Sequence, residues 1–126
     1  GAAGADYDRD GRWDLAVAQN GGTTHLYRNR GAVPSHRIEL RGLAGNRAAI
    51  GATLRGTTAG SEGPRRGVFG GGGYWSQDSP VIPWPVSSGE VELEVAWPDG
   101  ETSGHVLSGE ARTWTFSHPD RLPGAP

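Results

Sequence analysis

The stretch "EVELEVAWPDG", residues 90–100, alternates large apolar side chains with acidic or small ones. Successive side chains of a strand point to opposite faces, so this period of two predicts a half-buried strand with a solvated acidic face. The expected inner residues are Val91, Leu93, Val95 and Trp97. The Pro-Asp-Gly sequence that follows predicts a turn, because proline fixes φ and glycine accepts a positive φ.

Glycine (22 residues) and proline (9 residues) divide the rest of the chain into short extended segments. Those with strand character are 36–42, 49–56, 103–109 and 112–118. In the second of them, Ile50, Ala52 and Leu54 are expected to share the inner face. No stretch has the 3.6-residue period of a helix. The sequence therefore predicts an all-β protein with a small antiparallel β-sandwich of about six to eight strands.

Four aspartates crowd into "ADYDRDGRWDL", residues 5–15. They are Asp6, Asp8, Asp10 and Asp14, at positions 1, 3, 5 and 9 of a loop. Carboxylates at alternate positions before a glycine, here Gly11, are typical of a calcium loop, in which the backbone carbonyl of the next residue, Arg12, also coordinates the ion. Position 12 is Val17 rather than the glutamate of an EF-hand, so Asp14 is the expected closing ligand. The alternative is an acidic turn without metal.

Two short strands are expected directly after this loop. Leu15, Val17 and Leu26 fall in them, and "QNGGTT", residues 19–24, predicts the turn between them. The sequence therefore predicts a calcium loop that leads directly into a β-hairpin. An all-oxygen ligand set argues against zinc or copper, but it does not separate calcium from another hard cation.

Composition excludes several classes of function. The chain has 126 residues, a net charge of −2, no cysteine and no lysine. We therefore expect no nucleic-acid partner, no cysteine nucleophile and no Schiff-base lysine. No run of about 18 apolar residues is present, so no membrane span is expected. Basic residues that are all arginine, with abundant glycine and alanine, are typical of a GC-rich bacterial genome.

The glycine-rich stretch "GVFGGGGYWSQDSP", residues 67–80, leaves two interpretations open. Tyr74, Trp75 and Trp84 could form an aromatic platform for a small molecule or a carbohydrate, because exposed rings stack on flat ligands. Alternatively, the aromatic side chains plug one end of the sandwich. A phosphate cradle is disfavoured by the missing lysine, and an oxyanion hole by the missing base.

Neither the histidines nor the acidic face of residues 90–94 indicates a catalytic site. No two histidines have the spacing of a metal-ligand pair, and a lone histidine on a strand is more often hydrogen-bonded or at the surface. Glu90, Glu92 and Glu94 are expected to form a solvated face that discourages edge-to-edge aggregation.

Residues 6–31 resemble an FG-GAP/VCBS repeat in their Asp/Gly pattern. The resemblance implies that residues 1–31 are part of one blade of a calcium-binding β-propeller. The chain opens within this repeat, so we expect the preceding blades to lie in missing upstream sequence or in a second chain of the same protein.

Three further blocks resemble the ASPIC/UnbV domain, which implies a domain over residues 34–118 and a tail over residues 119–126. The blocks, in family order, lie within 40–56, 70–80 and 91–103. One block departs, because "VIPWPVSSG", residues 81–89, stands where the family usually has His-Phe-Gly-Leu-Gly.

The two resemblances together imply the end of a larger protein of the cartilage acidic protein type, a group that includes bacterial relatives in enediyne gene clusters. The first hypothesis is a calcium-binding C-terminal module, with structural calcium and a sandwich that packs on the propeller or binds a partner. The alternative is the C-terminal part of a propeller-type biosynthetic enzyme that forms carbon–carbon bonds or cyclises its substrate at the propeller mouth. The first hypothesis favours a secreted protein, and the second a cytoplasmic one.

Overall fold

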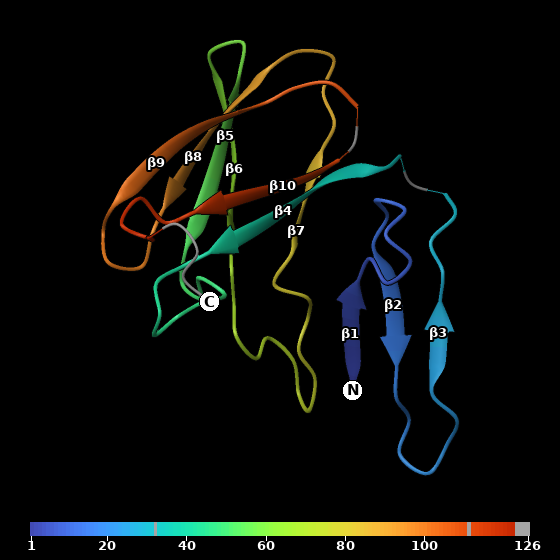
Figure 1. The fold of residues 1–126 in the computed structure, drawn as a ribbon. Helices are drawn as coiled ribbons and strands as arrows, with labels where there is room; N and C mark the ends of the chain where they lie inside the picture. The colour runs from blue at the N-terminus through green and yellow to red at the C-terminus, as the bar shows by residue number, and fades with distance from the viewer. Residues whose placement is uncertain (32, 111, 123–126) are drawn as a thin grey trace.

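The computed structural model describes residues 1–31, 33–110 and 112–122, and within these ranges it contains ten β-strands and no helix (Figure 1). The strands form three sheets, in the orders β1-β2-β3, β10-β4-β7 and β6-β5-β8-β9. The all-β prediction is confirmed. Among the described residues, no helix is long and apolar enough to cross a membrane.

The first sheet, called here the N-terminal sheet, contains the predicted hairpin. Its strands are β1 (Ala2–Ala5), β2 (Asp14–Val17) and β3 (His25–Tyr27), all antiparallel. The turn between β2 and β3 includes the predicted residues 19–24, and Gly21 adopts a positive φ of 72° there. The aspartate-rich loop connects β1 to β2.

The other two sheets form the sandwich. Its three-stranded sheet contains β4 (Ser35–Arg41), β7 (Ile82–Pro85) and β10 (Thr113–Ser117). Its four-stranded sheet contains β5 (Thr53–Thr58), β6 (Ser61–Gly67), β8 (Val91–Ala96) and β9 (Thr102–Leu107). One pair departs from the antiparallel prediction, because β10 runs parallel to β4. A parallel pair needs a long crossover, and here the whole four-stranded sheet lies between β4 and β10 in sequence.

The hydrophobic core lies between the two sheets of the sandwich. Strand β8 contributes the predicted inner face: Val91, Leu93 and Val95 are buried, and so is Trp97, directly after the strand. They pack with residues of the opposing sheet such as Ile38, Leu40 and Phe116. Burying each large apolar side chain contributes roughly 1.5–3 kcal/mol, so this core is the main source of stability. No residue of 1–31 belongs to it.

The segment 49–56 differs from its prediction at its first residues. The strand begins at Thr53, and Ile50 lies exposed in a turn instead of on the inner face. The amide side chain of Asn46 bonds both backbone groups of Ile50, at 2.9 and 2.8 Å, and Gly51 adopts a φ of +92°. These bonds stabilise a turn that the alternation of apolar residues did not reveal.

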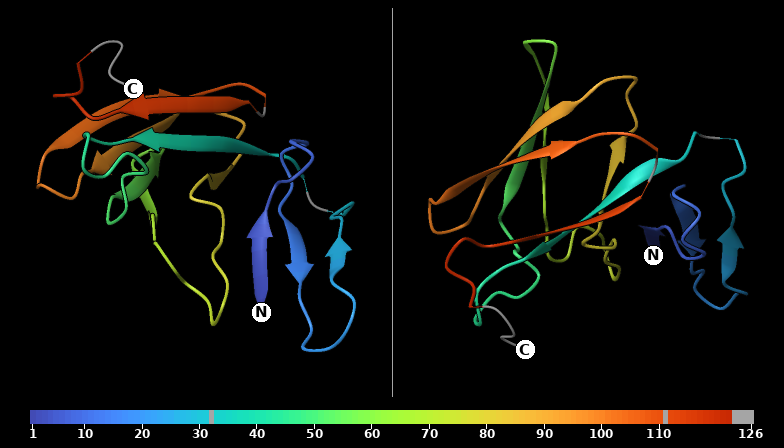
Figure 2. Two further views of the ribbon diagram at one scale, coloured as in Figure 1. Left: turned by 60° about the horizontal axis from the view of Figure 1, so that its bottom comes forward. Right: turned by 45° about the horizontal axis from the view of Figure 1, so that its top comes forward.

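The N-terminal sheet stands beside the sandwich (Figure 2), and backbone hydrogen bonds join the two near β4 and along β1. Near the start of β4, the Ser35 N–H donates to the Gly11 carbonyl at 2.8 Å. Along the outer edge of β1, Gly4 N–H donates to Asp78 Oδ1 at 2.7 Å, and Gly4 O accepts from the Ser79 N–H at 2.9 Å. The loop before β7 therefore covers the edge of β1, which leaves β3 as the open edge strand.

The predicted tail, residues 119–126, is only partly described. Arg121 Nη1 donates to the Gly42 carbonyl at 2.7 Å, so this part of the segment contacts the end of β4. Residues 123–126 lie outside the described residues.

Candidate functional site

Three of the four predicted aspartate ligands converge where the loop between β1 and β2 meets Asp14, the first residue of β2. One carboxylate oxygen from each of Asp6, Asp8 and Asp14 lies within 4.8 Å of the other two. Calcium binds oxygen at 2.3–2.6 Å, so two ligands on opposite sides of the ion lie at most about 4.6–5.2 Å apart. The three oxygens could therefore share one calcium ion.

Backbone donors contact all three carboxylates, Asp8 through a 3.3 Å bond from the Asp10 N–H. Asp6 accepts from the N–H groups of Asp10 and Gly11, both at 3.0 Å. Asp14 accepts from Tyr7 N–H at 3.2 Å and from Asn29 N–H at 2.7 Å. Gly11 has a φ of +84°, and a Cβ there would lie 3.1 Å from the Ser35 carbonyl oxygen. Backbone groups of the loop and of residues outside it therefore fix the loop, and Gly11 has the positive φ that a sharp turn requires.

Asp10 does not join the converging group. Its carboxylate Oδ2 lies 3.2 Å from Arg12 Nη1 and 3.3 Å from Arg28 Nη2. Desolvation alone would raise the pKa of Asp10, but hydrogen bonds from the Arg12 backbone N–H and the Arg28 guanidinium outweigh it and lower this pKa. Asp10 as a metal ligand stays a prediction, as does the backbone carbonyl of Arg12.

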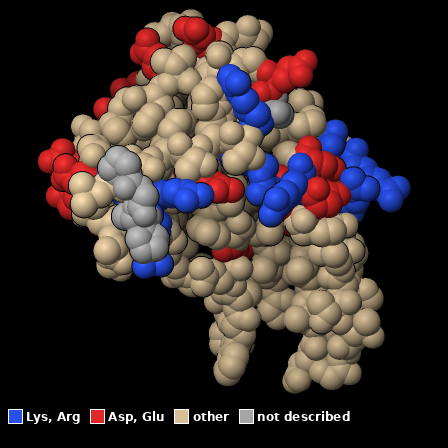
Figure 3. Space-filling view, viewed as in Figure 1, with Lys and Arg blue, Asp and Glu red and all other residues tan. Residues whose placement is uncertain are grey.

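Two arginines that the sequence interpretation missed balance the acidic loop. Arg28 Nε lies 2.6 Å from Asp8 Oδ2, and the neighbouring Asp8 charge is the main cause that raises the pKa of Arg28. Arg37, on the outer face of β4, forms an ion pair with the buried carboxylate of Asp6. In the space-filling view, acidic and basic atoms lie next to one another at this position (Figure 3). No spacing rule indicated these partners, because Arg28 directly follows β3 and Arg37 lies on β4, both outside the loop.

The predicted aromatic platform is not assembled as one group. Tyr74 and Trp75 are 86% and 87% exposed, and their rings meet edge-to-face at 6.2 Å. Trp84 instead belongs to the core, where it packs over Gly56. The expectation that Tyr74 and Trp75 plug the sandwich is wrong, because both side chains point into solvent. Binding of a flat ligand by this pair stays a prediction.

Three of the four histidines are held by local contacts. His36 Nδ1 accepts from Trp114 Nε1 at 3.3 Å, and burial, with a smaller effect of Arg112, lowers the pKa of His36. His105 Nε2 lies 3.0 Å from Ser103 Oγ, and burial lowers its pKa. His118 Nδ1 accepts from the Asp120 N–H at 3.1 Å. These contacts agree with the structural roles expected for lone histidines.

Comparison with known proteins supplies the family. Residues 42–122 match the family described as ASPIC and UnbV, so most of the chain lies within the matched region. The chain belongs to this family, as the sequence blocks predicted. Comparisons with curated proteins and with solved structures gave no match.

Proposed function

We propose that this chain is a calcium-binding module at the end of a larger β-propeller assembly. The convergence of Asp6, Asp8 and Asp14 within 4.8 Å carries the proposal. Calcium would act structurally, because it would neutralise three carboxylates in the loop that joins β1 to β2. Asp6 also pairs with Arg37 on β4, so a fixed loop would orient the N-terminal sheet against the sandwich.

The N-terminal sheet supports the second half of this proposal. Leu15 and Tyr27 are opposite each other on one face, Leu26 lies on the other face, and all three are exposed. A sheet of three strands with three or four residues each cannot bury either face by itself. Residues 15–27 carry no Asp, Glu, Lys or Arg, so this surface suits an uncharged neighbouring blade. The resemblance of residues 6–31 to an FG-GAP/VCBS repeat points to the same neighbour.

Thermal melting with calcium, with magnesium and with chelator tests the calcium-binding half. At a tenfold excess over its dissociation constant, calcium stabilises the folded state by about 1.4 kcal/mol. For a chain of this size we expect a rise in Tm of roughly 4–7 °C. Asp8→Asn should abolish this rise, because Asp8 is one of the three converging ligands.

Glu92→Gln serves as the matched control, because it removes one carboxylate from the exposed face of β8. It should keep the full response to calcium. The intact mass of the native preparation tests the assembly, since further blades of the same protein should co-purify. The proposal would be contradicted if no further blades co-purified with the wild-type chain and its Tm were the same in calcium and in chelator.

A further inference from the structure

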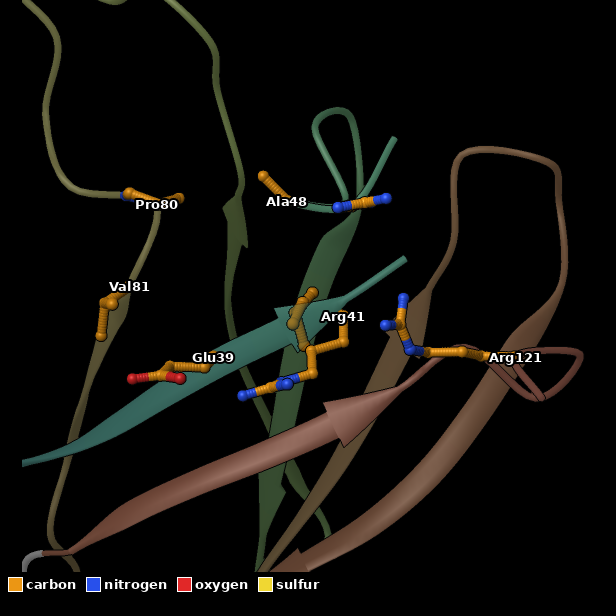
Figure 4. Close-up of a pocket in the computed structure, with 8 residues that line it drawn as sticks. Glu39, Arg41, Ala48, Pro80, Val81 and Arg121 are labelled. Carbon is orange, nitrogen blue, oxygen red and sulfur yellow. The ribbon is translucent and has the colours of Figure 1, made fainter. Parts of the chain in front are cut away.

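A second polar site lies on the sandwich, away from the aspartate loop. Three arginines and one glutamate line a pocket of about 440 Å³ together with small and apolar residues. The lining residues are Glu39, Leu40, Arg41, Arg47, Ala48, Pro80, Val81 and Arg121. They come from β4, the loop before β5, the segment before β7 and the C-terminal segment (Figure 4).

The charge of this pocket is opposite to that of the chain. Three guanidinium groups and one carboxylate give the lining a formal charge of +2, whereas the whole chain carries −2. Within the described ranges, no carboxylate lies within 4.0 Å of the guanidinium of Arg41 or Arg47. The positive charges of Arg41 and Arg47 can therefore attract an anion.

Hydrogen bonds fix the backbone of Arg47 and the side chain of Arg121. Arg47 lies in a loop whose ends are closed by a 3.0 Å bond from Gly42 N–H to the Arg47 carbonyl. A Cβ at Gly42 would lie 2.2 Å from the Asn46 carbonyl oxygen, so this loop requires glycine there. The side chain of Arg121 extends towards the end of β4, where it donates to Gly42 O (Figure 4). These contacts hold positive charge at the pocket before any ligand arrives.

We propose that this pocket binds a small organic molecule through a phosphate or sulfate ester group. Arginine presents several donors in a planar fork that matches the oxygens of such groups, and several arginines suit a doubly charged anion better than a single carboxylate does. The volume exceeds that of the anion alone and lies in the usual range for small-molecule sites. Pro80 and Val81 offer an apolar wall for the organic part, and Glu39 can accept a hydrogen bond from a ligand hydroxyl.

The test is a titration of the full chain with inorganic phosphate. Binding is monitored by ¹H–¹⁵N NMR of the arginine Nε–H groups. Calcium-free buffer, with chloride keeping the ionic strength constant, separates this test from the aspartate loop. The Nε–H signals of Arg41, Arg47 and Arg121 should shift saturably, with a dissociation constant on the order of 1–10 mM. Acetate should bind about tenfold more weakly, because it carries one charge.

Variants of exposed residues give the pocket its controls. Arg41→Gln and Arg47→Gln should each weaken phosphate binding about fivefold, and Glu39→Gln should strengthen it, because a repelling charge is removed. Arg30→Gln removes the same charge outside the pocket and should leave binding unchanged. The proposal would be overturned if the Nε–H chemical shifts changed linearly with phosphate concentration and the Arg30 signal changed in the same way. It would also be overturned if Arg41→Gln and Arg47→Gln bound phosphate as tightly as the wild type. If acetate bound as tightly as phosphate, the assignment of a phosphate or sulfate ester as the ligand would be wrong.

Discussion

Arg28 is paired with a carboxylate that a cation in the aspartate loop would use, so the proposed calcium site predicts competition between the two. Its Nε lies 2.6 Å from Asp8 Oδ2, an oxygen of a carboxylate that calcium would need. Arg28→Gln should therefore bind calcium about two to five times more tightly than the wild type, the factor that an exposed ion pair of this kind supplies. Isothermal titration calorimetry measures the affinity. Arg30→Gln is the control for long-range charge, and an Arg28→Gln affinity no higher than that of Arg30→Gln would contradict the competition.

The sequence predicted the convergence of carboxylates in this loop better than it predicted their arginine partners. The places of Asp6 and Gly11 in the loop could be predicted from their spacing alone, because both belong to one short loop in which the Gly11 N–H donates to Asp6. Arg37 could not be assigned in this way, since its contact with Asp6 depends on how β4 lies against the loop. Asp10 shows the same limit, because spacing cannot reveal that arginines hold its carboxylate. Local geometry is encoded locally, whereas long-range ion pairs depend on the folded chain.

Two glycines of the four-stranded sheet differ in what a side chain would meet. A Cβ at Gly56 on β5 would lie 2.3 Å from Trp84 Cζ2 and 3.0 Å from Val91 Cγ1, whereas a Cβ at Gly104 on β9 would meet nothing within 4 Å. Gly56→Ala should therefore lower the free energy of unfolding by about 1–3 kcal/mol through overpacking. Gly104→Ala should raise it by about 0.5 kcal/mol, because alanine loses less backbone entropy. Urea unfolding measures both, and equal stability of the two variants would contradict the packing at Trp84.

Strands that alternate cleanly were predictable, even at a sheet edge, as for β10, whereas strands that contain proline were not. The sequence indicated β8 and β10, where buried and exposed side chains alternate. It missed β6, whose residues "SEGPRRG" include Pro64, and β7, which contains Pro83 and Pro85. Both are edge strands, and proline is tolerated there because one side of the strand needs no partner. It also missed β1, "AAGA", which has little strand propensity and is paired by β2 and by the loop at Asp78 and Ser79.

At the scale of the whole molecule, an apolar core stabilises the sandwich, whereas hydrogen bonds and ion pairs stabilise the N-terminal sheet. Every residue of the apolar core comes from the sandwich. The N-terminal sheet has buried carboxylates, Asp6 and Asp14, and exposed apolar side chains instead. Its stability therefore depends on the hydrogen bonds and ion pairs of the loop, on the contacts of Gly4 with Asp78 and Ser79, and on the pairing of Asp6 with Arg37. The sequence could indicate two segments of different character, but not these contacts between them.

This difference predicts that the N-terminal sheet opens before the sandwich does. Regions with few buried apolar contacts open with a lower free energy than the core does. In hydrogen exchange followed by mass spectrometry, peptides from residues 1–31 should exchange at least about tenfold faster than peptides from β5 and β8, and calcium should slow only the former. Chelator should reverse that slowing without changing the exchange of the sandwich. If both parts instead gain and lose protection together, the two parts unfold as one cooperative unit, and the loop is coupled to the core through Arg37 more strongly than its hydrogen bonds indicate.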